Sequence, residues 1–273
     1  MMQTQRQSYT GANGRESLYE LTTNSTHQEL VLFVHGFMGF MDWGAWHLVR
    51  DFFAHAGFDF CRFNLSHNGG NTNDPIDFPD TEAFGKNTYT KELIDISSLL
   101  KHLESKHRTY QKIHLIGHSR GGGIAILAAQ KWKHASQLGE VCTWAAICDI
   151  ERRFPSGKEL ELWKETGLRF VKNGRTLQNL PQYYELYMDF QRNKVELAIL
   201  AAAKEIGKRL HIFHGDQDTA VPISEAHELY EVSGAKVSEI KGADHVFGAS
   251  HPWNKPTLPP LLEELCKKTL KCL

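Results

Sequence analysis

The stretch that decides the fold is residues 113–123, which read Ile-His-Leu-Ile-Gly-His-Ser-Arg-Gly-Gly-Gly. The apolar run 113–116 predicts a strand buried within a sheet. Small and apolar residues follow Ser119, and they predict a helix that packs against that sheet. Ser119 is therefore expected at the turn between a buried strand and a buried helix.

The same alternation of strand and helix continues on both sides of this stretch. Apolar runs predict further buried strands at residues 30–34, 58–63, 141–147 and 210–213, an edge strand at 236–240, and two short strands at 6–9 and 17–22. Helical periodicity occupies residues 43–54, 91–103, 224–230 and 258–270. This pattern predicts an α/β fold with a mostly parallel sheet and helices on both faces.

One stretch, residues 150–207, interrupts the alternation. It mixes aromatic and charged residues with Gly and Pro and has no run typical of a buried strand. A loop of this length without secondary structure is implausible inside a compact domain, so we expect a small helical insertion that forms a lid. The whole chain, 1–273, is then expected to be a single catalytic domain that carries this lid.

Composition excludes several classes of protein. The 273 residues include 31 Lys and Arg against 32 Asp and Glu, a net charge of -1, which argues against nucleic acid as a partner. No apolar run approaches the roughly 18–20 residues of a membrane span, so we expect no membrane partner. Five widely spaced cysteines suit a reducing compartment, and the N-terminus lacks the apolar core of a signal peptide. We therefore expect a cytoplasmic protein, with no metal site and no cofactor.

Residues 117–121 form a Gly-x-Ser-x-Gly motif in the strand–turn–helix setting that suits a nucleophilic serine. Ser119 would occupy a strained turn, and a bulky side chain at 117 or 121 would collide with its neighbours. The N-terminus of the following helix would direct N–H groups toward developing negative charge. We therefore interpret Ser119 as a nucleophile rather than as a simple helix cap.

A serine nucleophile needs a base, and the base needs an acid that orients it. His245 lies in a loop between the last predicted strand and the terminal helix. Asp216 and Asp218 both follow the strand at 210–213, at the edge where open α/β sheets build their sites. From position alone, both aspartates remain candidates for the acid.

Two backbone N–H groups are candidates for an oxyanion hole. One belongs to Phe37, in the glycine-rich turn that follows the strand at 30–34, and the other belongs to Arg120, directly after the nucleophile.

Substrate contacts are predicted at Met38, His67, Trp163 and Tyr184. Met38 lies in an unusually apolar turn, His67 at the expected rim, and the two aromatic residues in the lid. The alternative for Met38 is packing in the core, for His67 hydrogen bonding to local backbone groups, and for the two aromatic residues packing within the lid. We also expect His118 to pack beside the nucleophile and the pair Arg152-Arg153 to be a solvated face.

Together these motifs resemble the α/β-hydrolase superfamily. The matching residues are His35-Gly36-Phe37, Gly117-His118-Ser119-Arg120-Gly121-Gly122, His214-Gly215-Asp216-Gln217-Asp218 with Val221-Pro222, and Gly242-Ala243-Asp244-His245. More narrowly, the chain is similar to the dienelactone hydrolase-like and cinnamoyl/feruloyl esterase-like serine hydrolases. The family spacing His-Gly-x-x-Asp-x-x-Val-Pro implies that Asp218, not Asp216, is the acid.

The chain also departs from the family pattern. Residues 64–70 read Asn-Leu-Ser-His-Asn-Gly-Gly where many relatives carry an Asp-x-x-Gly-x-Gly turn, and Arg120 replaces a smaller residue. The nucleophile is Ser rather than Cys, which argues against true dienelactone hydrolase chemistry.

We therefore expect a serine hydrolase that cleaves small or medium carboxylic esters through an acyl-enzyme on Ser119. The near-neutral chain favours an uncharged or weakly charged ester as its small-molecule partner. A peptidase or thioesterase with the same triad is an alternative, as is a non-catalytic binding protein of this fold. The sequence leaves the oligomeric state open.

Overall fold

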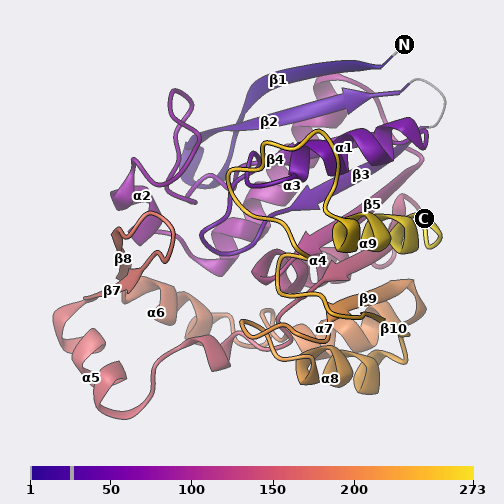
Figure 1. Cartoon of the computed structure of the whole chain (residues 1–273). Helices are drawn as coiled ribbons and strands as arrows, with labels where there is room; N and C mark the ends of the chain where they lie inside the picture. Colours follow the sequence, from indigo (N-terminus) through magenta and orange to yellow (C-terminus); the bar gives the residue numbers. More distant parts are fainter. Residues whose placement is uncertain (1, 25–27) are drawn as a thin grey trace.

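A computed structural model describes residues 2–24 and 28–273, and an eight-stranded sheet runs through its centre (Figure 1). The strand order is β1-β2-β4-β3-β5-β6-β9-β10. The bounds are β1 (Gln3–Thr10), β2 (Glu16–Thr23), β3 (Glu29–Val34), β4 (Asp59–Phe63), β5 (Lys112–His118), β6 (Leu138–Trp144), β9 (Leu210–Gly215) and β10 (Val237–Ile240). β1 and β2 pair antiparallel, as do β2 and β4, and the remaining pairs are parallel. The α/β fold predicted from the sequence is confirmed.

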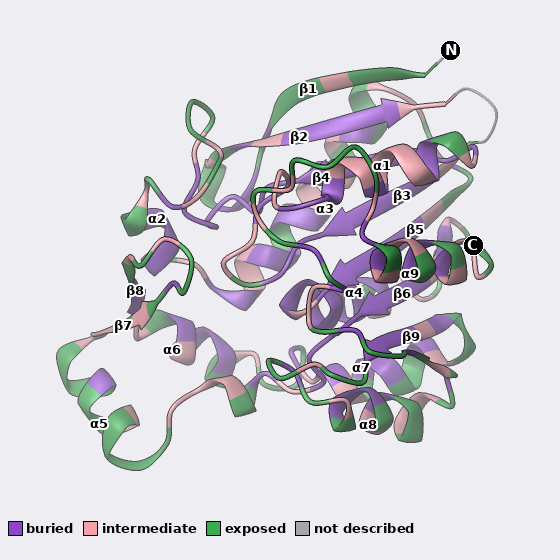
Figure 2. Ribbon diagram, in the orientation of Figure 1, coloured by how far each residue is buried: buried purple, intermediate pink, exposed green. Residues whose placement is uncertain are grey.

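Helices cover both faces of this sheet. On one face lie α1 (Trp46–His55) and α9 (Pro260–Leu270), and on the other lie α3 (Tyr89–Lys106), α4 (Arg120–Lys131), α7 (Ile199–Ile206) and α8 (Ser224–Ser233). Successive side chains of β3 point to opposite faces, so Phe33 packs with Trp46 of α1, whereas Leu32 and Val34 belong to the other core. Figure 2 shows that the central strands are buried along most of their length.

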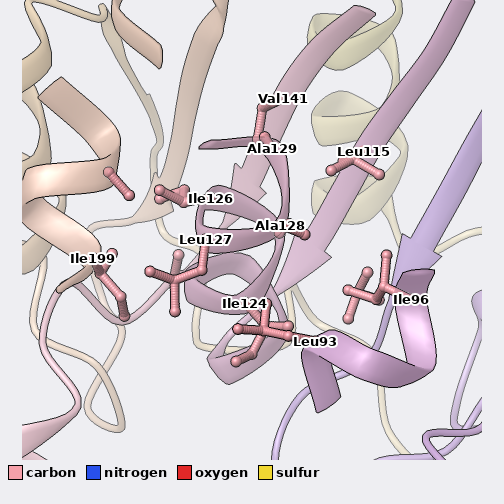
Figure 3. Packing of buried hydrophobic residues seen from close by; sticks show 14 of the residues in the cluster. Leu93, Ile96, Leu115, Ile124, Ile126, Leu127, Ala128, Ala129, Val141 and Ile199 are labelled. Atoms are coloured by element: carbon pink, nitrogen blue, oxygen red, sulfur yellow. The ribbon is translucent and has the colours of Figure 1, made fainter. Parts of the chain in front are cut away.

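The helix that follows Ser119, α4, is the most deeply buried one. Its residues 120–129 are all buried, which explains why small and apolar residues occupy every side of it. Ile124 and Leu127 of α4 lie near Leu93 of α3 and Ile199 of α7 (Figure 3). The strand–turn–helix unit that carries Ser119 is therefore held rigidly from several directions.

The segment between β6 and β9 differs from the purely helical insertion that the sequence predicted. It contains η2 (Glu151–Arg153), α5 (Gly157–Thr166) and α6 (Glu185–Arg192), and also an antiparallel hairpin of β7 (Leu168–Lys172) and β8 (Asn179–Tyr183). The hairpin escapes prediction because both strands are short, Pro181 lies in β8 and Phe170 of β7 is exposed. The last helix of the predicted insertion, α7, packs against α4 and α8 in the main core.

The remaining elements are short: η1 (Ala12–Gly14), α2 (Thr81–Gly85) and η3 (Gly207–Arg209). The predicted strand at 141–147 ends at Trp144, and residues 145–147 belong to the loop beyond it. Within residues 2–24 and 28–273, no helix is both long and apolar enough to span a membrane. All five cysteines are free, and four of them are buried.

Candidate active site

Ser119 occupies the turn between β5 and α4 with φ of 57°, an unfavourable conformation for a residue with a side chain. Its N–H donates to the carbonyl oxygen of Trp144 over 2.8 Å. A Cβ added to Gly117 would lie 2.3 Å from the Gly121 oxygen, and one added to Gly121 would lie 2.3 Å from the Val34 oxygen. The two glycines are required because backbone segments meet there without room for a side chain.

His245 links Ser119 to Asp218. Its Nε2 lies 3.0 Å from Ser119 Oγ, and its Nδ1 lies 2.7 Å from Asp218 Oδ2. The three side chains come from three separate turns of the chain, and they form one continuous line of hydrogen bonds. This is the arrangement of a serine nucleophile, a base and an orienting acid.

Asp218, rather than Asp216, is the aspartate that reaches His245. Its carboxylate has no exposed surface, and its Oδ1 accepts the N–H groups of Ala220 and Val221 over 2.8 and 2.9 Å. Burial alone would raise the pKa of Asp218, but hydrogen bonds from His214, His245 and Val221 outweigh burial and hold it well below its usual value. Asp216 instead accepts the N–H of Gly242 over 2.6 Å.

His118 supports the loop that carries His245. Its Nε2 lies 2.8 Å from the carbonyl oxygen of His245, and because a carbonyl only accepts, that nitrogen carries the hydrogen. Burial, helped by the neighbouring imidazole of His245, lowers the pKa of His118 to about 3. His118 is therefore neutral at physiological pH. The sequence predicted its packing role but not this hydrogen bond.

The turn 35–39 lies directly against the nucleophile. A Cβ added to Gly36 would lie 2.9 Å from Ser119 Cβ. The buried imidazole of His35 fixes this turn, with Nδ1 2.9 Å from the Gly36 oxygen and Nε2 accepting the N–H of Leu65. Phe37 and Arg120, whose N–H groups were predicted to bind the oxyanion, both line a cavity together with Ser119.

Two cavities meet at Ser119 and His245. The smaller, of about 130 Å³, is lined by the turn that includes Met38, together with Trp43 and Trp46. The larger, of about 340 Å³, is lined by Phe37, Ser119, Arg120, Ile147, Arg153, Arg169, Val171, Gln182, Ala220, Val221 and His245. Met38 therefore lies beside the nucleophile, as predicted for a substrate contact.

The other three predicted substrate contacts line neither cavity. His67 is buried beside Ser66, whose Oγ lies 2.8 Å from its Nδ1. Trp163 is buried in the insertion, where its Nε1 donates to the Gln182 oxygen over 2.8 Å and its ring contacts Tyr184. Trp163 belongs to the main buried cluster and the partly exposed Tyr184 packs against that cluster, where apolar rings gain from burial.

The larger cavity contains residues that sequence reasoning missed. Arg153 was expected on a solvated face, yet it lines this cavity and pairs with the buried Glu225. Arg169 and Gln182 come from the hairpin β7–β8, which the sequence did not predict. No local pattern in the sequence marks either residue. Among the residues with described positions, no group of three His, Cys, Asp or Glu could hold a metal ion.

Comparison with known proteins agrees with this geometry. Residues 31–254 match the model of the alpha/beta hydrolase family. A comparison with curated proteins finds no significant match.

Solved structures similar to this chain include three hydrolases. Alpha/beta hydrolase GrgF from Penicillium sp. sh18 has a TM-score of 0.72 and 13% identity, covering 99% of this chain and 97% of that one. Est1E from Butyrivibrio proteoclasticus, with ferulic acid bound, has a TM-score of 0.71 and 18% identity, covering 96% and 97%. The monoacylglycerol lipase of Paleococcus ferrophilus has a TM-score of 0.63 and 18% identity, covering 98% and 97%. At these identities the likenesses show the fold, and the family model matches most of the sequence: the chain belongs to the alpha/beta hydrolase family.

Proposed function

We propose that the protein is a serine hydrolase of carboxylic esters in which Ser119, His245 and Asp218 form the catalytic triad. The observation that carries this proposal is the hydrogen-bonded line from Ser119 Oγ through His245 to Asp218, with distances of 3.0 and 2.7 Å. Ser119 stands at the mouth of two cavities, so an ester can reach it from either side.

The proposed reaction passes through an acyl-enzyme. Ser119 Oγ attacks the ester carbonyl while His245 Nε2 takes the hydroxyl proton, and Asp218 stabilises the imidazolium. The N–H groups of Phe37 and Arg120 stabilise the oxyanion, and His245 returns its proton to the leaving alcohol. Water then attacks the acyl-enzyme with His245 again as the base, which releases the acid and restores Ser119.

The cavities support a small or medium ester as the substrate. Their volumes of about 340 and 130 Å³ suit a ligand with one modest group on each side of the reacting carbon. Est1E, which shares the fold, is known with ferulic acid bound, and an aromatic acid of that size is compatible with the larger cavity.

The position of the insertion supports its interpretation as a lid on a single catalytic domain. Arg153, Arg169 and Gln182 from the segment between β6 and β9 complete the larger cavity around Ser119. The triad itself draws on the middle and on the C-terminal part of the chain.

Turnover of p-nitrophenyl butyrate by the purified protein tests this function. Ser119→Ala should reduce kcat by roughly 10⁴-fold or more, because all the covalent chemistry depends on that hydroxyl. Ser105→Ala is the matched control, since its exposed Oγ only donates to the His102 oxygen. A fluorophosphonate should label the wild type and Ser105→Ala but not Ser119→Ala. A folded wild-type protein that is neither labelled nor active would favour a non-catalytic binding protein, and faster turnover of amides or thioesters would reassign the substrate class.

A further inference from the structure

Three guanidinium groups line the larger cavity beside Ser119. They belong to Arg120 at the start of α4, Arg153 in η2 and Arg169 in β7. No Asp or Glu is among the residues that line this cavity. The chain as a whole is nearly neutral, so this local excess of positive charge is a property of the site.

Two of the three arginines have a carboxylate partner behind the cavity wall. Arg120 Nη1 lies 3.3 Å from Oε1 of Glu92, and its guanidinium stacks on the rings of Phe37 and Tyr89. Arg153 pairs with Glu225. Both glutamates are buried and each lies within ion-pair distance of its arginine, although burial raises the pKa of Glu92 against the attraction of Arg120.

Arg169 has no such partner. Its Nε and Nη2 lie 2.9 and 2.7 Å from Oε1 of Gln182, a neutral amide, and its guanidinium lies over the Trp163 ring at 4.3 Å. In the part of the chain that the structure describes, no carboxylate oxygen lies within 4.0 Å of it, and Glu159 acts on it only from farther away. One positive charge therefore remains unbalanced in the cavity.

Two polar atoms near these arginines have no hydrogen-bond partner among the described residues, one on Arg153 and one on Tyr89, whose ring contacts Arg120. Arg153 Nε and Tyr89 Oη are buried without a hydrogen bond. Arg169 is half-buried, and this burial lowers its pKa. An anionic group in the cavity would compensate for this lost solvation.

We propose that the substrate is an ester that carries a free carboxylate, and that Arg169 binds this carboxylate within the larger cavity. This inference rests on the proposed function. A single unbalanced cation matches a carboxylate monoanion better than a phosphate, which carries up to two charges. Nε and Nη2 of the planar guanidinium already donate to Gln182, so the edge formed by Nη1 and the second hydrogen of Nη2 is the one left for a carboxylate. The uncharged ester expected from the net charge of the chain is replaced by an anionic one.

Paired substrates of similar size, one with a carboxylate and one with a neutral group in its place, test the proposal. For a carboxylate on the acyl side, mono-p-nitrophenyl glutarate is compared with p-nitrophenyl pentanoate. For a carboxylate on the leaving group, 4-(butyryloxy)benzoate is compared with its methyl ester. In at least one pair, wild-type kcat/KM should favour the anionic ester by roughly 10-fold or more, mainly through a lower KM.

Arg169→Gln should reduce this preference at least tenfold, as expected for the loss of a charge-assisted hydrogen bond. Arg152→Gln is the matched control, because Arg152 pairs with Glu228 outside the cavity and the net charge changes equally. It should keep the wild-type preference. Arg169→Lys retains the charge and should keep part of the preference for the anionic ester. This variant replaces Arg169→Gln in the test if Arg169→Gln does not fold.

The outcomes separate this inference from the proposed function. If the wild type hydrolyses neutral esters with Ser119 but prefers the anionic ester in neither pair, the carboxylate proposal is overturned and the hydrolase stands. Equal loss of preference in Arg169→Gln and Arg152→Gln also overturns it, because the effect would then be one of net charge. If no ester is hydrolysed and Ser119 is not labelled, the proposed function fails and this inference fails with it.

Discussion

Asp218→Asn should inactivate the protein, and the hydrogen bonds around the carboxylate show why. Oδ1 of Asp218 accepts two backbone N–H groups, from Ala220 and Val221. The single side-chain oxygen of an asparagine would occupy the position of Oδ1, where it can accept both N–H groups. Its NH₂ group would then replace Oδ2, which lies 2.7 Å from His245 Nδ1. Two donors cannot share that contact, so His245 would adopt the tautomer with its hydrogen on Nε2. That nitrogen could then no longer accept the proton of Ser119.

The expected loss follows from this change of tautomer. The same substitution in a serine protease triad lowers kcat by about 10⁴-fold, and we expect a loss of roughly 10³- to 10⁴-fold here. Since each factor of ten is about 1.4 kcal/mol, the transition state loses about 4–5 kcal/mol. Asp216→Asn is the matched control, because an asparagine oxygen can still accept the N–H of Gly242 at this exposed position.

The assay is kcat for p-nitrophenyl butyrate, measured for both variants after circular dichroism has shown that each is folded. Asp216→Asn should stay within about threefold of the wild type, the effect expected of a surface substitution. Comparable losses in the two variants, or less than tenfold loss in Asp218→Asn, would refute the assignment of the acid.

Three further predictions concern the surroundings of the triad. Gly36→Ala should lower both activity and the free energy of unfolding, the latter by about 1–3 kcal/mol, because the new methyl group would lie 2.9 Å from Ser119 Cβ. Gly174→Ala, where a Cβ meets nothing within 4 Å, should leave both unchanged in the same urea titration and ester assay. His118→Leu should lower kcat by about tenfold with little change in KM, because the hydrogen bond that holds the His245 carbonyl is lost, and steady-state kinetics measure this split. Burial lowers the pKa of His35 to about 4 and that of His118 to about 3, so below pH 6.5 the unfolded chain binds protons that the folded protein excludes. Each histidine should therefore reduce the free energy of unfolding by about 1 kcal/mol when the pH falls from about 7 to about 5.5. In urea titrations at these two pH values, His35→Asn should lose about 1 kcal/mol less than the wild type loses.

The sheet and the proximity of Ser119 to His245 were predictable because their signals are local. Buried parallel strands such as β3 and β5 are continuous apolar runs, and their carboxyl ends meet at one edge of the sheet. Ser119 and His245 could therefore be placed together from the positions of their turns. The choice between Asp216 and Asp218 required the family spacing, since both follow the same strand and only hydrogen bonds distinguish them.

The wall of the larger cavity could not be predicted in the same way. The strands β7 and β8 pair with each other rather than with the main sheet, and each has only five residues. Nothing in the local sequence shows that Arg169 would face Ser119 from such a hairpin. Its position depends on contacts between segments far apart in the chain, and the spacing of apolar residues along the sequence does not predict such contacts.

The predicted contact at Trp163 and the charges of the larger cavity both depend on features that the sequence does not record. Trp163 was chosen because it is aromatic, but a large ring gains more from burial than from exposure in a cavity, and it is buried against Phe154, Tyr184 and Tyr187. From there it contacts the Arg169 guanidinium with its face and the Gln182 carbonyl with its N–H, so it acts on the cavity through the two residues that line it. The net charge of the chain likewise did not predict the positive charge of Arg169 in the cavity. Net charge averages over the whole surface, whereas a cavity responds to the few charges in its wall and to whether each has a partner. At Arg169 that partner is a neutral amide, so the proposed carboxylate site is compatible with a chain whose net charge is -1.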